Sequence, residues 1–198
     1  MLFRSHSKIV PVPIGPKWQW TSTAMYGESK GYIMSLLNYY DCQQAKSNFL
    51  RRRKNLVYMN FNINTSKKTC FKEHTGIRKV AHDKLGWRYS STPSSDFDGY
   101  LKDMQEYKFA LSPPGAGIDT HRTWEALMLG VIPIVWSTSS INSLYDQLPV
   151  LIVNDWSILT KEYLEEQYEL IRNRVDDYCF EKLTYDYWKN QINDISNK

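Results

Sequence analysis

The stretch of sequence that decides the fold is KFALSPPGAGIDTHRTWEALMLGVIPIV, residues 108–135. It begins with an apolar run, passes through a loop rich in proline and glycine, continues at helical spacing to Gly130 and ends in a second apolar run. Two short apolar runs separated by a helix of this length are typical of two parallel strands joined by a helical crossover. The stretch therefore predicts an α/β fold.

Further apolar runs and helical patterns alternate on both sides of this unit. We predict strands over residues 56–62 (LVYMNFN), 87–91 (WRYSS), 107–112, 131–136 and 149–153, and helices over residues 66–86, 96–106, 121–130, 140–147 and from 160 onward. In the last of these regions, apolar residues at roughly helical spacing, Leu170 among them, predict core packing. Alternating strands and helices are typical of a parallel sheet with both faces covered. The predicted fold class is α/β, a Rossmann-like parallel sheet flanked by helices.

The first 54 residues have a different character. Residues 9–20 (IVPVPIGPKWQW) carry three prolines and a glycine among apolar residues, which predicts an extended or turning connector that packs on another part of the protein. A helix is predicted over residues 29–38. The basic run at residues 51–54 (RRRK) is interpreted as a solvated helix end or loop, and a nuclear-import or nucleic-acid patch is the alternative.

The composition narrows the classes of protein to consider. Hydrophobic residues make up 42% of the 198 residues, so the chain has enough apolar surface for a folded core. A net charge of +4 is too small for a dedicated nucleic-acid binder but is compatible with an anionic small ligand. The cysteines lie far apart with no CxxC pair, which indicates neither a disulfide framework nor a zinc site. No apolar run approaches the roughly 20 residues of a membrane helix and no signal peptide is recognisable, so a cytoplasmic location is the default expectation.

The loop between the two apolar runs is the strongest candidate for a ligand site. Ligands of open parallel sheets bind beyond the carboxyl ends of the strands, where loops lead into helix N-termini. Gly115 and Gly117 let the backbone approach a ligand closely, and the free amides and the dipole of the following helix favour an anion such as a diphosphate. Asp119 or Thr120 is placed to cap that helix.

Polar residues share one side of the helix that follows this loop. His121 and Glu125 are four residues apart, and Arg122 and Glu125 are three apart. A nucleotide-sugar pocket requires a cation beside the anion site, here Arg122, and a carboxylate one turn later for ribose or sugar hydroxyls, here Glu125. An ordinary helix with an Arg–Glu surface pair has the same spacing, and the spacing alone does not separate the two interpretations.

Other site motifs fit less well. A dinucleotide fingerprint requires a third glycine where this sequence has Thr120, and the sequence contains no P-loop and no GxSxG motif. Asp96 and Asp98 match the DxD motif that binds a metal and a nucleotide diphosphate in one class of glycosyltransferases. A helix cap by Asp96 explains the same residues, and the predicted site has no metal.

Residues 108–135 resemble the donor-binding half of exostosin-like glycosyltransferases (family 47 type), which have the GT-B fold. The signature of that family is a strand, a loop of small residues, an Arg and then a Glu on one helix, and Gly-x-x-Pro-Val/Ile leading into a strand. Arg122, Glu125 and the residues from Gly130 to Ile134 match it here. The similarity extends more loosely over residues 57–174. Fucosyltransferase-like GT-B enzymes have a related layout with a Glu–Lys pair at that helix.

The resemblance implies transfer of a sugar from a UDP- or GDP-sugar donor to a hydroxyl of a glycan or protein acceptor, without a metal or other cofactor. It implies a cleft lined by Asn60, Asn62, Arg78, Ser112, Gly115, Gly117, Asp119, His121, Arg122 and Glu125. Ser112 and the two glycines would line the phosphates. Arg122 would neutralise the leaving diphosphate, with Arg78 as a second cation, and Glu125 would hold the ribose. No catalytic base is assigned, although Asp119 and His121 lie near the site.

The resemblance also implies a domain organisation. A GT-B enzyme has two Rossmann domains, and the N-terminal one carries the acceptor site and usually the catalytic base. We therefore expect residues 1–54 to be a connector and the remnant of an N-terminal domain, and residues 55–198 to be the donor-binding domain with C-terminal helices. A partner chain would then supply the acceptor domain. The alternative is a non-catalytic nucleotide-binding or interaction module derived from such a domain.

Overall fold

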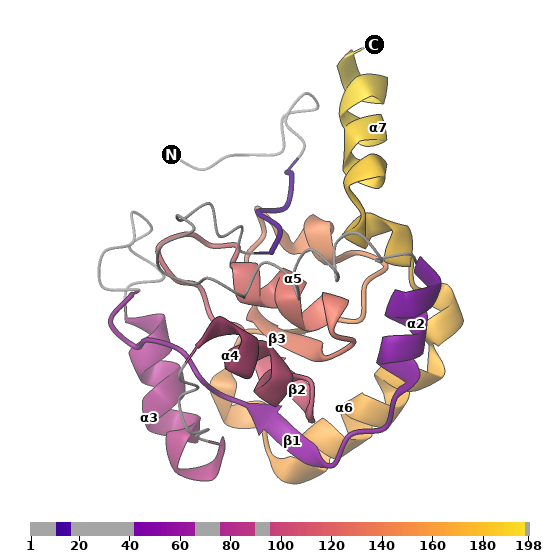
Figure 1. Ribbon diagram of the computed structural model, residues 1–198. Coiled ribbons are helices and arrows are strands. Elements are labelled where there is room, and N and C mark those ends of the chain that lie inside the picture. Colours follow the sequence, from indigo (N-terminus) through magenta and orange to yellow (C-terminus); the bar gives the residue numbers. More distant parts are fainter. Residues whose placement is uncertain (1–10, 17–41, 66–75, 90–95, 197–198) are drawn as a thin grey trace.

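The computed structural model describes residues 11–16, 42–65, 76–89 and 96–196. Within these ranges the strands form one four-stranded parallel sheet in the order β1-β2-β3-β4 (Figure 1). The strands are β1 (Asn55–Tyr58), β2 (Tyr107–Leu111), β3 (Ile132–Trp136) and β4 (Leu151–Val153). The predicted α/β fold with a Rossmann-like parallel sheet is confirmed.

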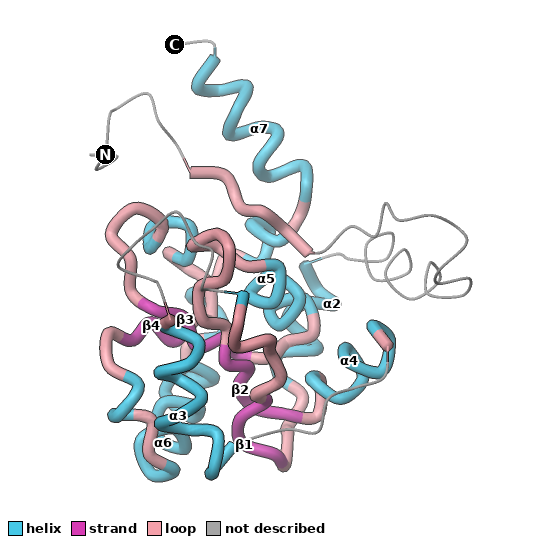
Figure 2. The backbone as a smooth tube through the Cα atoms, turned by 90° about the vertical axis from the view of Figure 1, so that its left-hand side faces the viewer, coloured by secondary structure: helices cyan, strands magenta, loops and turns pink. Residues whose placement is uncertain are grey.

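Helices cover both faces of this sheet. The α-helices are α2 (Cys42–Leu50), α3 (Ile77–Tyr89), α4 (Phe97–Met104), α5 (His121–Met128), α6 (Lys161–Asn173) and α7 (Tyr185–Ser196). Short 3-10 helices are η3 (Asn142–Tyr145), η4 (Trp156–Ile158), η5 (Val175–Asp177) and η6 (Phe180–Leu183). Figure 2 shows α3 and α4 on opposite sides of the strands.

The alternation of side chains along the strands assigns the helices to the two faces. Tyr58 and Ala110, which are in register on β1 and β2, pack in a cluster with buried residues of α4. The preceding residues, Val57 and Phe109, belong to the main core together with residues of α3 and α6. On that side the Phe109 ring lies 6.0 Å from the ring of Tyr168 in α6, measured between centroids. The sheet is therefore buried on both faces, as expected for parallel strands.

The chain crosses closely at the end of α5. Gly130 has a φ of 69°, and a Cβ atom at this position would overlap the backbone of Asn48 in α2. The Asn48 side chain donates a hydrogen bond to the carbonyl oxygen of Met128 at 3.3 Å. Glycine is therefore required here for both its backbone conformation and its size, and it ends the helix where the sequence predicts.

The basic run at residues 51–54 is only partly solvated, which corrects the prediction. Arg51, Arg52 and Lys54 are exposed, whereas Arg53 is only 6% exposed. Its guanidinium donates hydrogen bonds at 2.7–2.9 Å to four backbone carbonyl oxygens, those of Asn48, Arg51, Gln105 and Leu129. Three of these carbonyls lie at or near the C-terminal ends of α2, α4 and α5, where helices leave acceptors without a partner. Arg53 is thus a structural residue that joins three helix ends.

Four other predictions differ from the structure or lie, in whole or in part, outside its described residues. The predicted strand over residues 87–91 is wrong where it can be compared, because residues 87–89 continue α3. Gly86 has no positive φ, and a helical glycine without a following proline costs only about 1 kcal/mol, so the helix passes through it. Leu170 on α6 is 51% exposed and is not a core residue. The predicted helix over residues 29–38, and residues 66–75 of another, lie outside the described residues.

Helix α7 projects from the rest of the protein (Figure 2). Trp188 holds its first turn, because the indole Nε1 donates to the carbonyl oxygen of Lys182 at 2.6 Å. Among the helices of the described residues, α7 included, none combines the length and the apolar composition needed to cross a bilayer.

Candidate functional site

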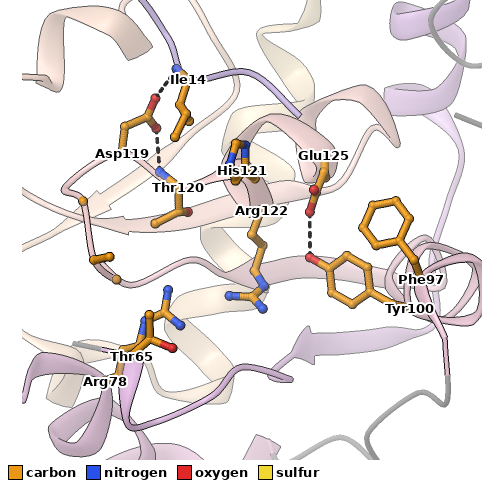
Figure 3. Close-up of a pocket in the computed structure, with 13 residues that line it drawn as sticks. Ile14, Thr65, Arg78, Phe97, Tyr100, Asp119, Thr120, His121, Arg122 and Glu125 are labelled. Atoms are coloured by element: carbon orange, nitrogen blue, oxygen red, sulfur yellow. Dashed lines mark hydrogen bonds between the residues drawn. The ribbon is translucent and has the colours of Figure 1, made fainter. Parts of the chain in front are cut away.

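A cavity of about 430 Å³ opens beyond the carboxyl ends of β1 and β2 (Figure 3). Its lining comes from the loops after these strands, from α3, α4 and α5, and from the N-terminal segment. The lining residues are Ile14, Thr65, Arg78, Phe97, Tyr100, Gly115, Ala116, Gly117, Asp119, Thr120, His121, Arg122 and Glu125. The position is the one that ligands occupy in open parallel sheets.

Arg78 reaches the cavity from the first turn of α3. Its guanidinium donates to the carbonyl oxygens of Pro114 at 2.9 Å, Asn62 at 3.2 Å and Pro113 at 3.3 Å. It is only 7% exposed. Burial, and next the positive charge of Arg122, lower the pKa of Arg78 from 12.5 to about 10, so the side chain is still charged at neutral pH. Arg78 therefore fixes the two loops and places a positive charge between them.

Arg122 approaches the same space from the first turn of α5 (Figure 3). Its Nη2 donates to the carbonyl oxygen of Asn60 at 2.6 Å, and its buried Nε has no hydrogen-bond acceptor among the described residues. The guanidinium carbon lies 5.7 Å from the ring centroids of both Phe61 and Tyr100, within cation–π distance. A guanidinium has five N–H donors. Most of the N–H donors of Arg122 therefore make no hydrogen bond within the described part of the chain.

The glycine-rich loop fits closely around Arg78. A Cβ atom on Gly115 would lie 2.6 Å from Nη2 of Arg78, whereas one on Gly117 would meet only the carbonyl oxygen of Asp119 at 3.4 Å. The first distance is shorter than any normal contact, so a side chain at residue 115 would displace the guanidinium. Gly115 is thus required by the arginine, and Gly117 is not.

Glu125 is buried on the inner side of α5, with 6% of its surface exposed. Its Oε2 accepts a hydrogen bond from the hydroxyl of Tyr100 at 3.0 Å. Burial raises the pKa of Tyr100 well above its ordinary value, so the phenol keeps its proton and acts as the donor. The carboxylate expected to hold a sugar hydroxyl is therefore oriented by a residue of α4.

Asp119 and His121 fasten the N-terminal segment to the cavity. The Asp119 carboxylate accepts from the backbone N–H of Ile14 at 2.8 Å and from Nε1 of Trp124 at 2.9 Å. Nδ1 of His121 lies 2.8 Å from the carbonyl oxygen of Gly15. The described part of the predicted connector, residues 11–16, therefore packs on the start of α5, as the sequence predicts.

The structure brings most of the predicted site residues together. Seven line the cavity: Arg78, Gly115, Gly117, Asp119, His121, Arg122 and Glu125. Ser112 does not, since it is buried and its hydroxyl lies 3.4 Å from the carbonyl oxygen of Ala110. Asn60 and Asn62 contribute through their backbone carbonyls, which accept from Arg122 and Arg78. Their side chains bond locally, to the Tyr58 hydroxyl and the Asn64 N–H.

Two aromatic residues of α4 are missing from the predicted site. Phe97 and Tyr100 both line the cavity, and their rings stack at 5.6 Å between centroids. Their spacing of three residues, which places them on one face of a helix, is a signal that the sequence contains. In this segment the DxD motif is singled out from the sequence, and the two aromatic residues are not. Asp96 caps α4, because its Oδ1 accepts from the N–H of Gly99 at 2.6 Å, as the helix-cap interpretation predicts.

Comparisons with known proteins add no assignment to this geometry. No protein-family model matches the chain, and no curated protein matches its sequence. The resemblance of residues 108–135 to exostosin-like glycosyltransferases therefore contributes to the function only as a proposal.

Proposed function

We propose that this chain is the donor-binding portion of a metal-independent glycosyltransferase, similar to the exostosin-like enzymes. One observation carries the proposal: two guanidiniums, those of Arg78 and Arg122, share a cavity with a glycine-rich loop and a buried carboxylate, Glu125. A UDP- or GDP-sugar has matching chemistry, with an anionic diphosphate between a ribose and a sugar.

The charge arrangement supports an anionic ligand. Within the described residues, all hydrogen bonds of Arg78 and Arg122 go to backbone carbonyls, so their charges are not neutralised by a hydrogen-bonded carboxylate. Placing two positive charges side by side is unfavourable, and a bound diphosphate would relieve the repulsion. Charge-assisted hydrogen bonds from guanidinium to phosphate are short and strong.

The proposed reaction uses this charge when the sugar leaves. The bond between the anomeric carbon and the diphosphate oxygen breaks, the diphosphate keeps the electron pair, and an acceptor hydroxyl oxygen bonds the sugar. Fixed guanidiniums stabilise the charge that develops on the leaving diphosphate. The proton of the acceptor hydroxyl requires a base, which we propose comes with the acceptor domain on a partner chain.

A second candidate is a module that binds the nucleotide without transferring a sugar. It is favoured by the state of Asp119, one of the two candidate bases beside the cavity. The Asp119 carboxylate accepts hydrogen bonds from Ile14, Thr120, Trp124 and Tyr145. The Gly15 carbonyl can only accept, so Nδ1 of His121 is the donor there, and the acceptor nitrogen of the neutral ring is Nε2.

The test is calorimetric titration of the purified chain with UDP, GDP, their sugars, NAD and ATP, with and without EDTA. We expect one nucleoside diphosphate to bind whether or not EDTA is present, and to stabilise the fold by about 2.7 kcal/mol at 100 times its dissociation constant. Arg122→Ala is expected to weaken binding by more than about tenfold, because it removes a charge-assisted contact.

The matched control is Arg174→Ala, an exposed arginine paired with Asp177 outside the cavity. It is expected to bind like the wild type. Equal affinity of the wild type and Arg122→Ala would refute the donor-binding proposal. Binding that disappears with EDTA would instead favour the metal-dependent alternative at Asp96 and Asp98. Release of nucleoside diphosphate from a bound donor, once an acceptor domain is added, separates transfer from binding alone.

A further inference from the structure

The aromatic pair on α4 forms one wall of the cavity. Phe97 and Tyr100 are one helical turn apart, and their rings stack at 5.6 Å with an interplanar angle of 29°. Tyr100 contacts two residues of α5 that lie one turn apart, Arg122 and Glu125 (Figure 3). Tyr100 therefore contacts both of the groups that we assign to the donor.

The contact with Glu125 has a defined direction. Burial keeps the Tyr100 phenol protonated, so its hydroxyl donates to Oε2 of Glu125 across 3.0 Å. A carboxylate offers about four acceptor positions, and this hydrogen bond occupies one of them. The hydrogen bond restrains the rotation of the carboxylate.

The contact with Arg122 restricts the second group. The guanidinium carbon lies 5.7 Å from the Tyr100 ring centroid and 5.7 Å from that of Phe61. A planar guanidinium near two aromatic faces loses less freedom when it binds a planar or tetrahedral anion, because its orientation is already limited. Tyr100 thus orients the carboxylate through its hydroxyl and restrains the cation through its ring.

We propose that Tyr100 is a positioning residue that sets the preference of the cavity for a ribonucleotide, by holding the Glu125 carboxylate toward the ribose hydroxyls. This inference rests on the proposed function, in which Glu125 holds the ribose of a nucleotide-sugar. The ring and the hydroxyl have separable roles. Removing the hydroxyl affects the ribose preference, and removing the ring affects the affinity for the phosphates.

The test compares a nucleoside diphosphate with its 2′,3′-dideoxy analogue, using whichever of UDP and GDP the wild type binds. The wild type is expected to prefer the ribonucleotide by about tenfold, the usual effect of one hydrogen bond to a charged group. Tyr100→Phe keeps the ring and is expected to reduce this preference below about threefold, with little change in affinity for the dideoxy analogue. Tyr100→Leu is expected to weaken the binding of both nucleotides.

Three further variants make the result specific. Tyr178→Phe removes a phenol hydrogen bond to the carbonyl oxygen of Ile171, away from the cavity, and is expected to keep the full preference. In Glu125→Gln the preference is expected to be small already, and adding Tyr100→Phe should not reduce it further. Thermal unfolding verifies that each variant is folded.

The outcomes distinguish the inference from the function on which it rests. A full ribose preference in folded Tyr100→Phe overturns the inference and leaves the proposed function standing. A wild type that binds the dideoxy analogue equally well overturns the role of Glu125, and the inference with it. A wild type that binds neither nucleotide overturns the proposed function itself.

Discussion

Arginines lie at the centre of two regions of the molecule, and Arg53 and Arg122 differ in how many of their N–H groups the protein uses. Arg53 donates four hydrogen bonds to carbonyls at the junction of α2, α4 and α5. Arg122 in the cavity donates one within the described residues, and its Nε is buried without an acceptor there. Burial lowers the pKa of both Arg53 and Arg78 to about 10. A buried arginine with a lowered pKa is therefore found in both regions and does not distinguish one from the other.

The number of hydrogen bonds that an arginine makes within the protein distinguishes a structural arginine from one that binds a ligand. A buried donor without a partner has a cost of about 1–3 kcal/mol, which a protein tolerates where a ligand completes the hydrogen bond. Helix α4 joins the two regions, because Gln105 at its C-terminal end accepts from Arg53 and Tyr100 on its inner face contacts Arg122. Substitutions that act on one region and not the other therefore test the comparison.

The largest effect on stability is expected from Arg53→Ala. The substitution removes one donor from each of four carbonyl oxygens. Among the described residues, only the carbonyl oxygen of Asn48 also accepts from a backbone N–H, that of Arg51. We therefore expect the free energy of unfolding to fall by about 3 kcal/mol. Urea denaturation measures the loss. The control is Arg52→Ala, whose side chain is 78% exposed and lies 3.8 Å from Glu169, and which should change stability by less than about 0.5 kcal/mol. Equal stabilities of the two variants would contradict the structural role of Arg53.

The next effect is on binding and concerns two glycines that look alike in the sequence. Gly115→Ala would bring a Cβ atom to 2.6 Å from Nη2 of Arg78, and three carbonyls hold that guanidinium in place. We expect nucleoside diphosphate affinity to fall by about tenfold, because Arg78 must move away from its loops. Gly117→Ala meets only ordinary contact distances and should keep affinity within about threefold. Titration calorimetry measures both, and a larger loss in Gly117→Ala would reverse the assignment.

Local patterns predicted the fold well because each strand contains a short run of apolar residues, although β1 ends at Tyr58 and the prediction extended it to residue 62. The unit at residues 108–135 contains both its strands and its helix, and the structure places β2, α5 and β3 there. The strand predicted over residues 87–91 is wrong because an isolated glycine is a weak helix stop. Arg53 could not be distinguished from its basic neighbours, since only the meeting of three helix ends gives it partners.

The candidate site was predictable where one segment supplies it. Gly115, Arg122 and Glu125 lie within eleven residues of each other, in the loop after a predicted strand and on the helix that follows it, where ligands of parallel sheets bind. Tyr100 and Ile14 reach the cavity from segments that are distant in sequence, so no local pattern connects them to it. The candidate site residues at strand ends were predicted from their position in the sequence. That position does not decide whether the side chain or the backbone of such a residue faces the cavity.

The smallest effect is expected at Asp119. Its carboxylate accepts hydrogen bonds from four residues, just as Arg53 donates to four carbonyl oxygens. The Tyr145 hydroxyl lies 3.3 Å from its Oδ1, and Tyr145→Phe removes that hydrogen bond. We expect a loss of about 1 kcal/mol at neutral pH, measured by urea denaturation. Tyr185→Phe, on a side chain that is 78% exposed, is the control and should change stability little at any pH.

The pH dependence of that loss identifies its cause. Burial, and next the Asp119 carboxylate, raise the pKa of Tyr145 above the 10.0 of the unfolded chain. Above pH 10 the unfolded state therefore releases this proton while the folded state keeps it, and the stability contributed by Tyr145 falls by about 1.4 kcal/mol per pH unit. The difference between wild type and Tyr145→Phe should then disappear within about one pH unit above 10, because every other titrating group is common to both proteins. A difference that stays constant from pH 8 to about 11 would contradict the raised pKa of Tyr145 and, with it, the role of its protonated hydroxyl.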